Sequence, residues 1–294
     1  MKEKYIKSPL NYVGSKYKLL SEILPLFPKS ICTFVDLFGG GFNVGINVDA
    51  EKVVYNDVNR DVVNLIEYLT HKDYETILHN TFSIIEKYKL SRTDLHGFEF
   101  YGCSSKTGKR IGIYNEKYYK ELRDYYNKNK LPELLYVLSI YSFNYQIRFN
   151  KNGDFNMPCG KQDFNKASQQ RLKEYKKLNK KVFFSNLPFN EFDFSDLKNS
   201  DLVYCDPPYL NSVASYNEQG GWTEKHENTL LSTLDRLNEM DIKFALSNNL
   251  KYENPLLDKW KDKYNIHYLN GDYSNCNYHK IDRSKDIEVL ITNY

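Results

Sequence analysis

The sequence of 294 residues predicts an α/β protein with a parallel, doubly wound sheet that a mostly helical insert interrupts. Short apolar runs typical of buried strands alternate with helical patterns at both ends of the chain, whereas the middle of the chain carries helical patterns alone. The length fits about two domains. We therefore expect one domain built from residues 1–70 and 181–294, and a second built from residues 71–180.

Helical and strand patterns alternate along the first of these domains. In chain order, the expected elements are a helix over 15–27, strands over 33–37 and 52–55, a helix over 59–68, strands over 182–185 and 202–205, a helix near 224–239, a strand over 242–246, a helix near 255–263 and a strand over 287–291. Strands separated by helices favour a parallel sheet. In the insert, helical patterns cover 71–88, 114–128 and 131–142, and a stretch rich in Gly and Asn follows at 148–160.

Composition limits the class of protein. Hydrophobic residues make up 41% of the chain, but no apolar run approaches the ~20 residues of a membrane span. The first residues lack the apolar stretch of a signal peptide. Five scattered cysteines without a C-x-x-C pair fit neither a disulfide framework nor a zinc ribbon. We therefore expect a cytoplasmic protein that has no contact with a membrane and no metal site.

The charge is unevenly distributed. Residues 71–180 contain 21 Lys and Arg against 12 Asp and Glu, a net charge of +9, whereas the remaining residues have 20 against 26, a net charge of −6. A basic block between acidic flanks favours binding of a polyanion. The densest basic run, over 171–181, also fits a solvated helix face.

Glycines directly follow the first predicted strand, at positions 39, 41 and 45. Glycine at such a place lets the backbone turn sharply into a helix and approach a ligand. The next strand ends close to Asp57, whose carboxylate could accept the two hydroxyls of a ribose or could cap the following helix. Together these features favour a cofactor that contains a nucleoside, and they leave open whether it is NAD or S-adenosylmethionine.

The apolar strand predicted over 202–205 leads directly into Asp206-Pro-Pro-Tyr209. Two adjacent prolines hold the chain extended, so the Asp206 carboxylate and the Pro207 carbonyl can face one small group. Two such acceptors would grip both N–H bonds of a planar exocyclic amine and direct its lone pair at an electrophile, while Tyr209 offers a ring for stacking. The simpler interpretation is a strand end, a proline turn and a core tyrosine.

With these motifs in this order, the chain resembles the Dam-like D12 class of DNA adenine-N6 methyltransferases. The resemblance covers nearly the whole chain. It rests on the segments Pro9–Lys16, Phe34–Gly45, Asn56–Asn59, Arg148–Pro158, Asp206–Tyr209 and Glu288–Tyr294. It implies a Rossmann-like methyltransferase sheet with an inserted target-recognition domain that carries a β-hairpin.

The resemblance also implies S-adenosylmethionine as cofactor, with S-adenosylhomocysteine as product and no metal. Lys16 would meet the methionine carboxylate, Asp36 the methionine amine and Asp57 the ribose. The implied cofactor-binding residues are Tyr12, Gly14, Lys16, Asp36, Phe38, Gly39, Gly41, Asp57 and Asp206, and the implied catalytic residues are Asp206, Pro207, Pro208 and Tyr209. The family often has Trp where this chain has Tyr12 and Gly where it has Ser15, and both changes keep an aromatic or a small side chain.

Double-stranded DNA is the expected partner, since the adenine amine must be rotated out of the duplex into the protein. Residues 148–158 predict a hairpin with Asn152-Gly153 as its turn, and a two-stranded ribbon fits the major groove. The candidate DNA contacts are Arg148, Asn150, Lys151 and Asn156. Asn156 could equally tie the hairpin together.

The sequence thus predicts a monomeric enzyme that transfers a methyl group from S-adenosylmethionine to N6 of a flipped-out adenine. A restriction endonuclease would be a functional partner without stable contact. The alternatives are methylation of another planar amine, such as cytosine N4 or an amine in RNA, an NAD-dependent oxidoreductase, and an inactive DNA-binding module. Cys159 follows a proline, as the nucleophile of cytosine-C5 methyltransferases does, but we expect an ordinary small residue there.

Overall fold

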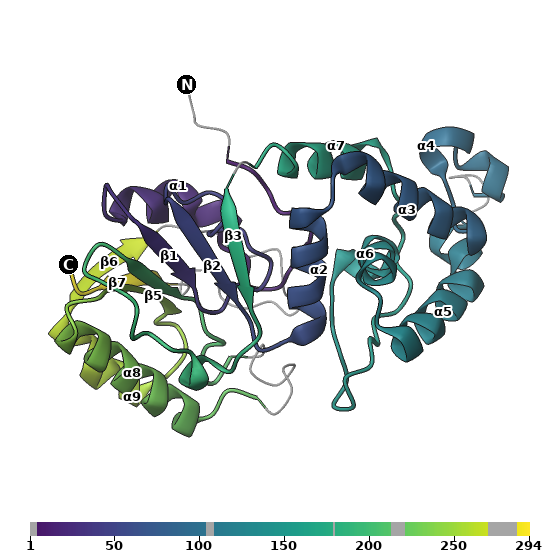
Figure 1. The fold of residues 1–294 in the computed structure, drawn as a ribbon. Helices are drawn as coiled ribbons and strands as arrows, with labels where there is room; N and C mark the ends of the chain where they lie inside the picture. Colours follow the sequence, from purple (N-terminus) through teal and green to yellow (C-terminus); the bar gives the residue numbers. More distant parts are fainter. Residues whose placement is uncertain (1–4, 104–108, 179, 213–220, 270–286) are drawn as a thin grey trace. The chain divides into compact units, whose positions relative to one another are not determined.

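Seven strands form one mixed sheet in the order β3-β2-β1-β4-β5-β7-β6, in the computed structural model of the chain (Figure 1). The structure describes residues 5–103, 109–178, 180–212, 221–269 and 287–294. The strands are β1 (Thr33–Asp36), β2 (Lys52–Asn56), β3 (Lys181–Ser185), β4 (Leu202–Cys205), β5 (Lys243–Asn249), β6 (Asn265–Leu269) and β7 (Glu288–Thr292). The predicted α/β class is confirmed.

The first five strands run parallel, and β7 runs antiparallel to both of its neighbours. From β1 the chain moves outward to β2 and β3, and it then returns to place β4 on the other side of β1. The strand order therefore reverses between β1 and β4, the place where open α/β sheets bind their ligands. The sequence did not predict β6, where only Leu269 is buried and the other residues are exposed or half-buried, as suits a strand at the edge of the sheet.

Helices cover both faces of the sheet. On one face, α8 (Glu224–Glu239) and α9 (Pro255–Trp260) bury leucines and Trp260 against Val203, Phe244 and Ile291. On the other face, Phe27 packs against the rings of Phe34 and Tyr204. The predicted helix over 15–27 is a series of short turns: a 3₁₀ turn at Lys16–Leu19, α1 (Leu20–Ile23) and a 3₁₀ turn at Leu24–Leu26.

The chain divides into two compact units. One holds Met1–Tyr5, Val13–Val63 and Asn179–Tyr294, which include the whole sheet, and the other holds Ile6–Tyr12 and Asn64–Leu178. The division falls inside α2 (Arg60–His71). The expected domain limits enclose some residues that the structure leaves undescribed, and those limits remain a prediction.

The second unit is helical. Its further helices are α3 (Tyr74–Lys87), α4 (Thr93–His96), α5 (Ile111–Asn129), α6 (Pro132–Tyr141) and α7 (Lys166–Tyr175), with 3₁₀ turns at Glu99–Tyr101 and Phe143–Tyr145. From Leu134 to Tyr141 every residue of α6 is buried, so α6 is the central helix of this unit, in contact with α3 and α5. The basic run over 171–181 begins within α7.

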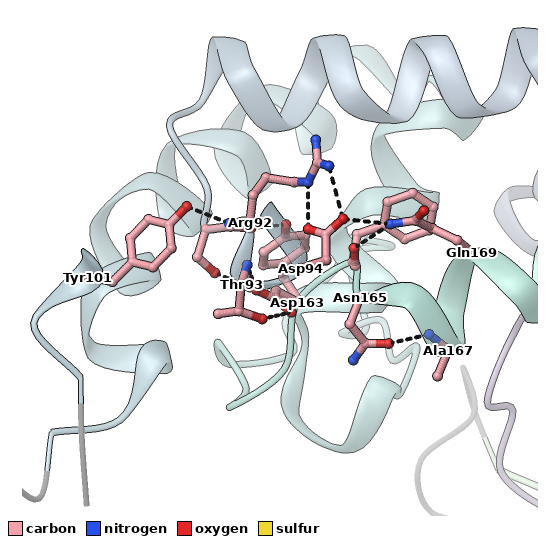
Figure 2. Close-up of polar contacts among 11 residues, drawn as sticks. Arg92, Thr93, Asp94, Tyr101, Asp163, Asn165, Ala167 and Gln169 are labelled. Carbon is pink, nitrogen blue, oxygen red and sulfur yellow. Dashed lines mark hydrogen bonds and ion pairs between the residues drawn. The ribbon is translucent and has the colours of Figure 1, made fainter. Parts of the chain in front are cut away.

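A buried polar cluster joins two segments of this unit that are about seventy residues apart in sequence (Figure 2). The buried Asp163 carboxylate accepts hydrogen bonds from the Thr93 backbone N–H at 2.7 Å, from the Thr93 hydroxyl at 2.9 Å and from the Ser91 hydroxyl at 3.2 Å. Arg92 holds the Asp94 carboxylate with two parallel bonds, and Gln169 donates to the same carboxylate. These bonds attach α4 to the start of α7.

We expect Asp163→Ala to lower the free energy of unfolding by about 2–4 kcal/mol, because three donors of Ser91 and Thr93 lose their buried acceptor. Asp73→Ala is the matched control, since Asp73 also accepts from a backbone N–H at a helix start but in an exposed place, where a lost cap costs about 1 kcal/mol. Urea unfolding followed by circular dichroism measures both. Equal losses for the two variants would contradict a structural role for the buried cluster.

Candidate active site

Three predicted carboxylates lie at the carboxyl ends of neighbouring strands. Asp36 is the last residue of β1, Asp57 follows β2, and Asp206 follows β4. Because β1 lies between β2 and β4, the ladder brings these three strand ends together where the strand order reverses. The three carboxylates, far apart in sequence, are thus gathered at one edge of the sheet.

Asp206 forms an ion pair with Lys16. The Lys16 ammonium nitrogen lies 2.5 and 2.6 Å from the two carboxylate oxygens, and it also donates to the Gly14 carbonyl at 3.1 Å. The Lys16 side chain is only 4% exposed and that of Asp206 18%. The sequence predicted both residues for the site, and the structure adds that they contact each other directly.

Tyr209 lies beside this pair. Its ring centroid is 5.2 Å from the Lys16 ammonium, and its hydroxyl is 3.4 Å from an Asp206 oxygen. The same hydroxyl lies 3.2 Å from Glu288, a buried residue at the start of β7. Sequence reasoning assigned no role to Glu288. The sequence does contain a feature that could have identified it: Glu288 stands directly before the apolar run Val289–Ile291, and an ionisable residue at such a place needs a buried partner.

Asp57 secures the glycine turn to the end of β2. One of its oxygens accepts from the Gly40 N–H at 2.9 Å, and the other accepts from the Asn59 N–H at 2.8 Å. Asn59, not Asp57, provides the side-chain oxygen for the first N–H groups of α2. Each Asp57 oxygen keeps a second lone pair for a ligand hydroxyl.

Two of the glycines are required by packing inside the turn. A Cβ atom on Gly39 would lie 2.3 Å from the Tyr55 ring, and one on Gly45 would lie 2.2 Å from the Phe42 ring and 3.0 Å from an Asp36 oxygen. The Gly45 N–H donates to that same Asp36 oxygen at 3.2 Å. Next to the turn, Phe38 packs against Phe189 and Trp222. Gly41 is buried within the turn, and Gly14 adopts a positive φ of 78°.

Burial shifts the acidity of these carboxyl groups. Desolvation raises the pKa of Asp36 from 3.8 to about 8, with smaller effects from its hydrogen bond to Gly45 and from the charges of Asp206 and Asp57. Burial also raises the pKa of Asp57, of Asp206 and of Glu288, although Lys16 acts in the opposite direction on the last two. A ligand that brings positive charge to this edge would stabilise the ionised carboxylates.

Pro207 and Pro208 follow Asp206 in the first unit, and the remaining predicted residues belong to the second unit. Tyr12 ends its first segment and is half-buried. Around 148–158 the chain reverses: Phe149 and Phe155 form an antiparallel bridge, the Gly153 N–H donates to the Asn150 carbonyl, and Gly153 has a φ of 78°. The side chain of Asn127 on α5 bonds both the N–H and the C=O of Phe155, which fixes one arm of the turn to that helix.

The four candidate DNA contacts differ in their hydrogen bonds within this turn and in their exposure to solvent. The Asn150 side-chain oxygen accepts from two backbone N–H groups of the turn, and Asn156 accepts from the Arg148 guanidinium at 2.9 Å. Asn156 therefore ties the two arms together, one of its two predicted roles. The exposed side chains of Arg148 and Lys151 project from the turn.

Neither Cys159 nor Cys205 has the environment of a nucleophilic thiol. Burial raises the pKa of Cys159 to about 12, so this thiol stays protonated near neutral pH. Cys205 lies in the core beneath α8 and α9, on the opposite face of β4 from Tyr204. Within the described ranges, no group of three or more His, Cys, Asp or Glu residues could hold a metal ion, and no helix has the length and apolar character needed to cross a membrane.

Comparison with known proteins agrees with this geometry. Residues 12–275 match the family of D12 class N6 adenine-specific DNA methyltransferases, and the chain belongs to that family. The chain is 44% identical over 301 residues to the type II methyltransferase M.FokI of Planomicrobium okeanokoites and 39% identical over 305 residues to the modification methylase StsI of Streptococcus sanguinis. Each alignment covers 99% of this chain but only 43% of the relative. The DNA adenine methylase of Escherichia coli K12 is 25% identical over 88% of this chain and 86% of its own length.

We expect Asp36→Asn to stabilise the ligand-free protein increasingly as the pH rises from about 4 to 8. The unfolded chain loses the Asp36 proton at its usual pKa, whereas the folded protein retains it to about 8, so the stability that this group contributes at low pH is lost across that window. The difference at pH 8 should be on the order of 2–5 kcal/mol. Urea unfolding of both proteins at pH 5 and pH 8 measures it, and parallel pH dependences would contradict the raised pKa.

Proposed function

We propose that this protein transfers a methyl group from S-adenosylmethionine to N6 of a flipped-out adenine in double-stranded DNA. The observation that carries the proposal is the position of Asp206-Pro-Pro-Tyr209 after β4, beside the glycine turn after β1, with Lys16 against Asp206. Family membership supports adenine as the base. Because the chain spans 43% of the length of M.FokI and StsI, the activity of the whole protein is part of the proposal.

The charges at the strand ends fit the cofactor that the family implies. Asp36, Asp57 and Asp206 are acids whose pKa burial raises, and Lys16 pairs with Asp206. When bound, S-adenosylmethionine supplies an electrophilic methyl group on a positively charged sulfonium. Asp36 would hold its ammonium group, Asp57 its ribose hydroxyls and Lys16 its carboxylate. The doubly negative pyrophosphate of NAD fits these acids poorly, which weighs against an oxidoreductase.

The other predicted cofactor contacts are Tyr12, Gly14, Phe38, Gly39 and Gly41. The glycines would let backbone N–H groups approach the ligand, and Phe38 would border it from the aromatic group formed with Phe189 and Trp222. Tyr12 would offer an aromatic surface.

The catalytic chemistry of this chain is hydrogen bonding and positioning. Asp206 and the Pro207 carbonyl would accept the two N–H bonds of the adenine amine, and Pro208 would keep the segment extended. Tyr209 would stack on the extruded base. Asp206 need not remove a proton first, since the amine becomes acidic once it carries the methyl group.

The second unit would bind the DNA. Its basic residues would hold the phosphates on either side of the target, which offsets part of the cost of rotating the base out. Arg148, Lys151 and the asparagines of the 148–158 turn would lie against the groove. A monomer would act in the cytoplasm of a prokaryotic cell, and a cognate restriction endonuclease would share its recognition site without a stable contact.

We expect Asp206→Ala to reduce methyl transfer to duplex DNA by about 10²–10³-fold, because an acceptor aimed at the reacting amine is lost. Asp206→Asn keeps one acceptor oxygen and should fall between Ala and the wild type. Incorporation of radiolabelled methyl groups, followed by digestion to nucleosides, gives both the rate and the modified base. Asp235→Asn, on α8 against Trp260 and Tyr264, is the control. Label in cytosine, or none in any adenine-containing duplex, would refute the proposal.

Variants in the 148–158 turn should distinguish base-specific contacts from electrostatic binding to the phosphates. We expect Arg148→Ala to reduce discrimination between the preferred site and a site with one changed base pair by about 1–3 kcal/mol. Lys151→Ala should weaken binding to all duplexes alike and reduce the slope of log K against log salt by about 1. Fluorescence anisotropy at several salt concentrations measures both. An effect of Arg148→Ala that is identical for all duplexes would contradict base reading.

A further inference from the structure

Glu288 is a buried carboxylate whose two oxygens are both engaged. It is 3% exposed, and in the β5–β7 ladder it lies directly opposite Asn249. One oxygen accepts from the Asn249 side-chain amide at 2.8 Å, and the other lies 3.2 Å from the Tyr209 hydroxyl. The cross-strand bond fixes the glutamate from one side, so its other oxygen faces the proposed catalytic segment.

The Tyr209 hydroxyl lies between two carboxyl groups. It is 3.2 Å from Glu288 Oε2 and 3.4 Å from Asp206 Oδ1. A phenol donates one proton and accepts through its oxygen, so it can donate to one carboxylate while it accepts from the other group once that group is protonated. Asp206, Tyr209 and Glu288 therefore form a continuous chain of proton-exchanging groups.

We propose that Glu288 positions Tyr209 and is the final acceptor of the proton that the adenine amine gives to Asp206. This inference rests on the proposed function. The N6–H bond breaks as an O–H bond forms on Asp206. That O–H bond then breaks as the Tyr209 oxygen takes the proton, while Tyr209 gives its own proton to Glu288. Asp206 is again a carboxylate, Tyr209 is neutral, and Glu288 holds one proton that passes to solvent when the product leaves.

The charges around Glu288 suit this role. Burial and the nearby Asp206 carboxylate raise the pKa of Glu288, which makes it a stronger proton acceptor than an exposed glutamate, and Lys16 acts in the opposite direction. The groups that face it are Lys16, Asp206, the neutral Tyr209 and the amide of Asn249. The Lys16 ion pair favours the carboxylate form of Asp206, and this favours transfer of a proton from Asp206 through Tyr209 to Glu288.

Glu288→Gln separates proton transfer from packing. Glutamine has nearly the same size, and its amide can bond both neighbours, with the oxygen toward Asn249 and an N–H toward the Tyr209 oxygen, but it cannot take up a proton. Tyr209→Phe keeps the stacking ring and removes the hydroxyl. The control is Glu227→Gln: Glu227 is 1% exposed, and it likewise accepts from one aromatic side chain, Trp222, and one asparagine amide, Asn254.

The first test is single-turnover methyl transfer as a function of pH. We expect Glu288→Gln to lower the plateau rate by about tenfold to a hundredfold, Tyr209→Phe to have a similar effect, and the double variant to be no slower than the slower single one. The acid limb of the pH–rate profile is the range in which the rate falls as Asp206 becomes protonated. In Glu288→Gln this limb should move to lower pH, because the loss of a neighbouring negative charge lowers the pKa of Asp206. Glu227→Gln should keep the wild-type position of that limb.

Two binding measurements distinguish this role from a merely structural one. Calorimetry of S-adenosylmethionine binding and the fluorescence of 2-aminopurine at the target position should be the same for Glu288→Gln and the wild type. A wild-type rate in Glu288→Gln would overturn the proposal. The proposal would also be overturned if Glu288→Gln lost cofactor binding or base flipping in proportion to its loss of rate while the acid limb of its pH–rate profile stayed in the wild-type position.

A further readout needs no methyl transfer. The infrared carboxylic acid band that is lost in Glu288→Gln reports the protonation of Glu288. The pH midpoint of this band in the wild type should lie above that of an ordinary glutamate. The midpoint should be lower in Asp206→Asn than in the wild type. A midpoint that Asp206→Asn leaves unchanged would overturn the proposal even if the enzyme methylates DNA. If the midpoint moves but the wild type methylates no DNA, the proposed function fails while the coupling of the two carboxyl groups stands.

Discussion

The site depends on burial of several carboxyl groups around one ammonium group. Parallel strands bring Asp36 and Asp206 to the same edge of the sheet, and the turn before the first helical segment places Lys16 against Asp206. Such a pair is costly to bury and even more costly to break, because the partner left behind would be an uncompensated charge. Desolvation, with a smaller effect of the Asp206 and Asp57 carboxylates, raises the pKa of Asp36, so burial disfavours its ionised form. A cofactor that carries positive charge would complete the electrostatic balance.

Contacts within the protein fix the shape of the glycine turn, which is also the candidate binding segment. Gly39 and Gly45 leave room for the rings of Tyr55 and Phe42, and the Tyr55 hydroxyl in turn donates to the Gly40 carbonyl. Asp57 holds the Gly40 N–H from the next strand. The turn is thus shaped by contacts of the protein itself, so its backbone is already ordered for a ligand, which lowers the entropy cost of binding.

The second unit is stabilised by its own polar contacts. The Asp163 cluster attaches α4 to the start of α7 (Figure 2). The side chain of Asn127 fixes the 148–158 turn to α5. A turn held rigidly at one arm can present Arg148 and Lys151 with little loss of entropy on binding, which would suit their proposed contacts with base edges or phosphates. These contacts leave the basic side chains at the tip exposed to solvent.

The sequence by itself determined the order of the elements and the residue types of the site. Apolar runs between turn residues located six of the seven strands that the described residues form, and Asp206-Pro-Pro-Tyr209 suggested a candidate catalytic segment because its chemistry lies in consecutive residues. Only the tertiary structure decided which of these residues meet. The Lys16–Asp206 pair spans 190 positions, and the Tyr209–Glu288 contact depends on the antiparallel placement of β7. Strand β6 and the contacts of Glu288 were not predicted from the sequence, because both are set by neighbours distant in the chain, which no local pattern encodes.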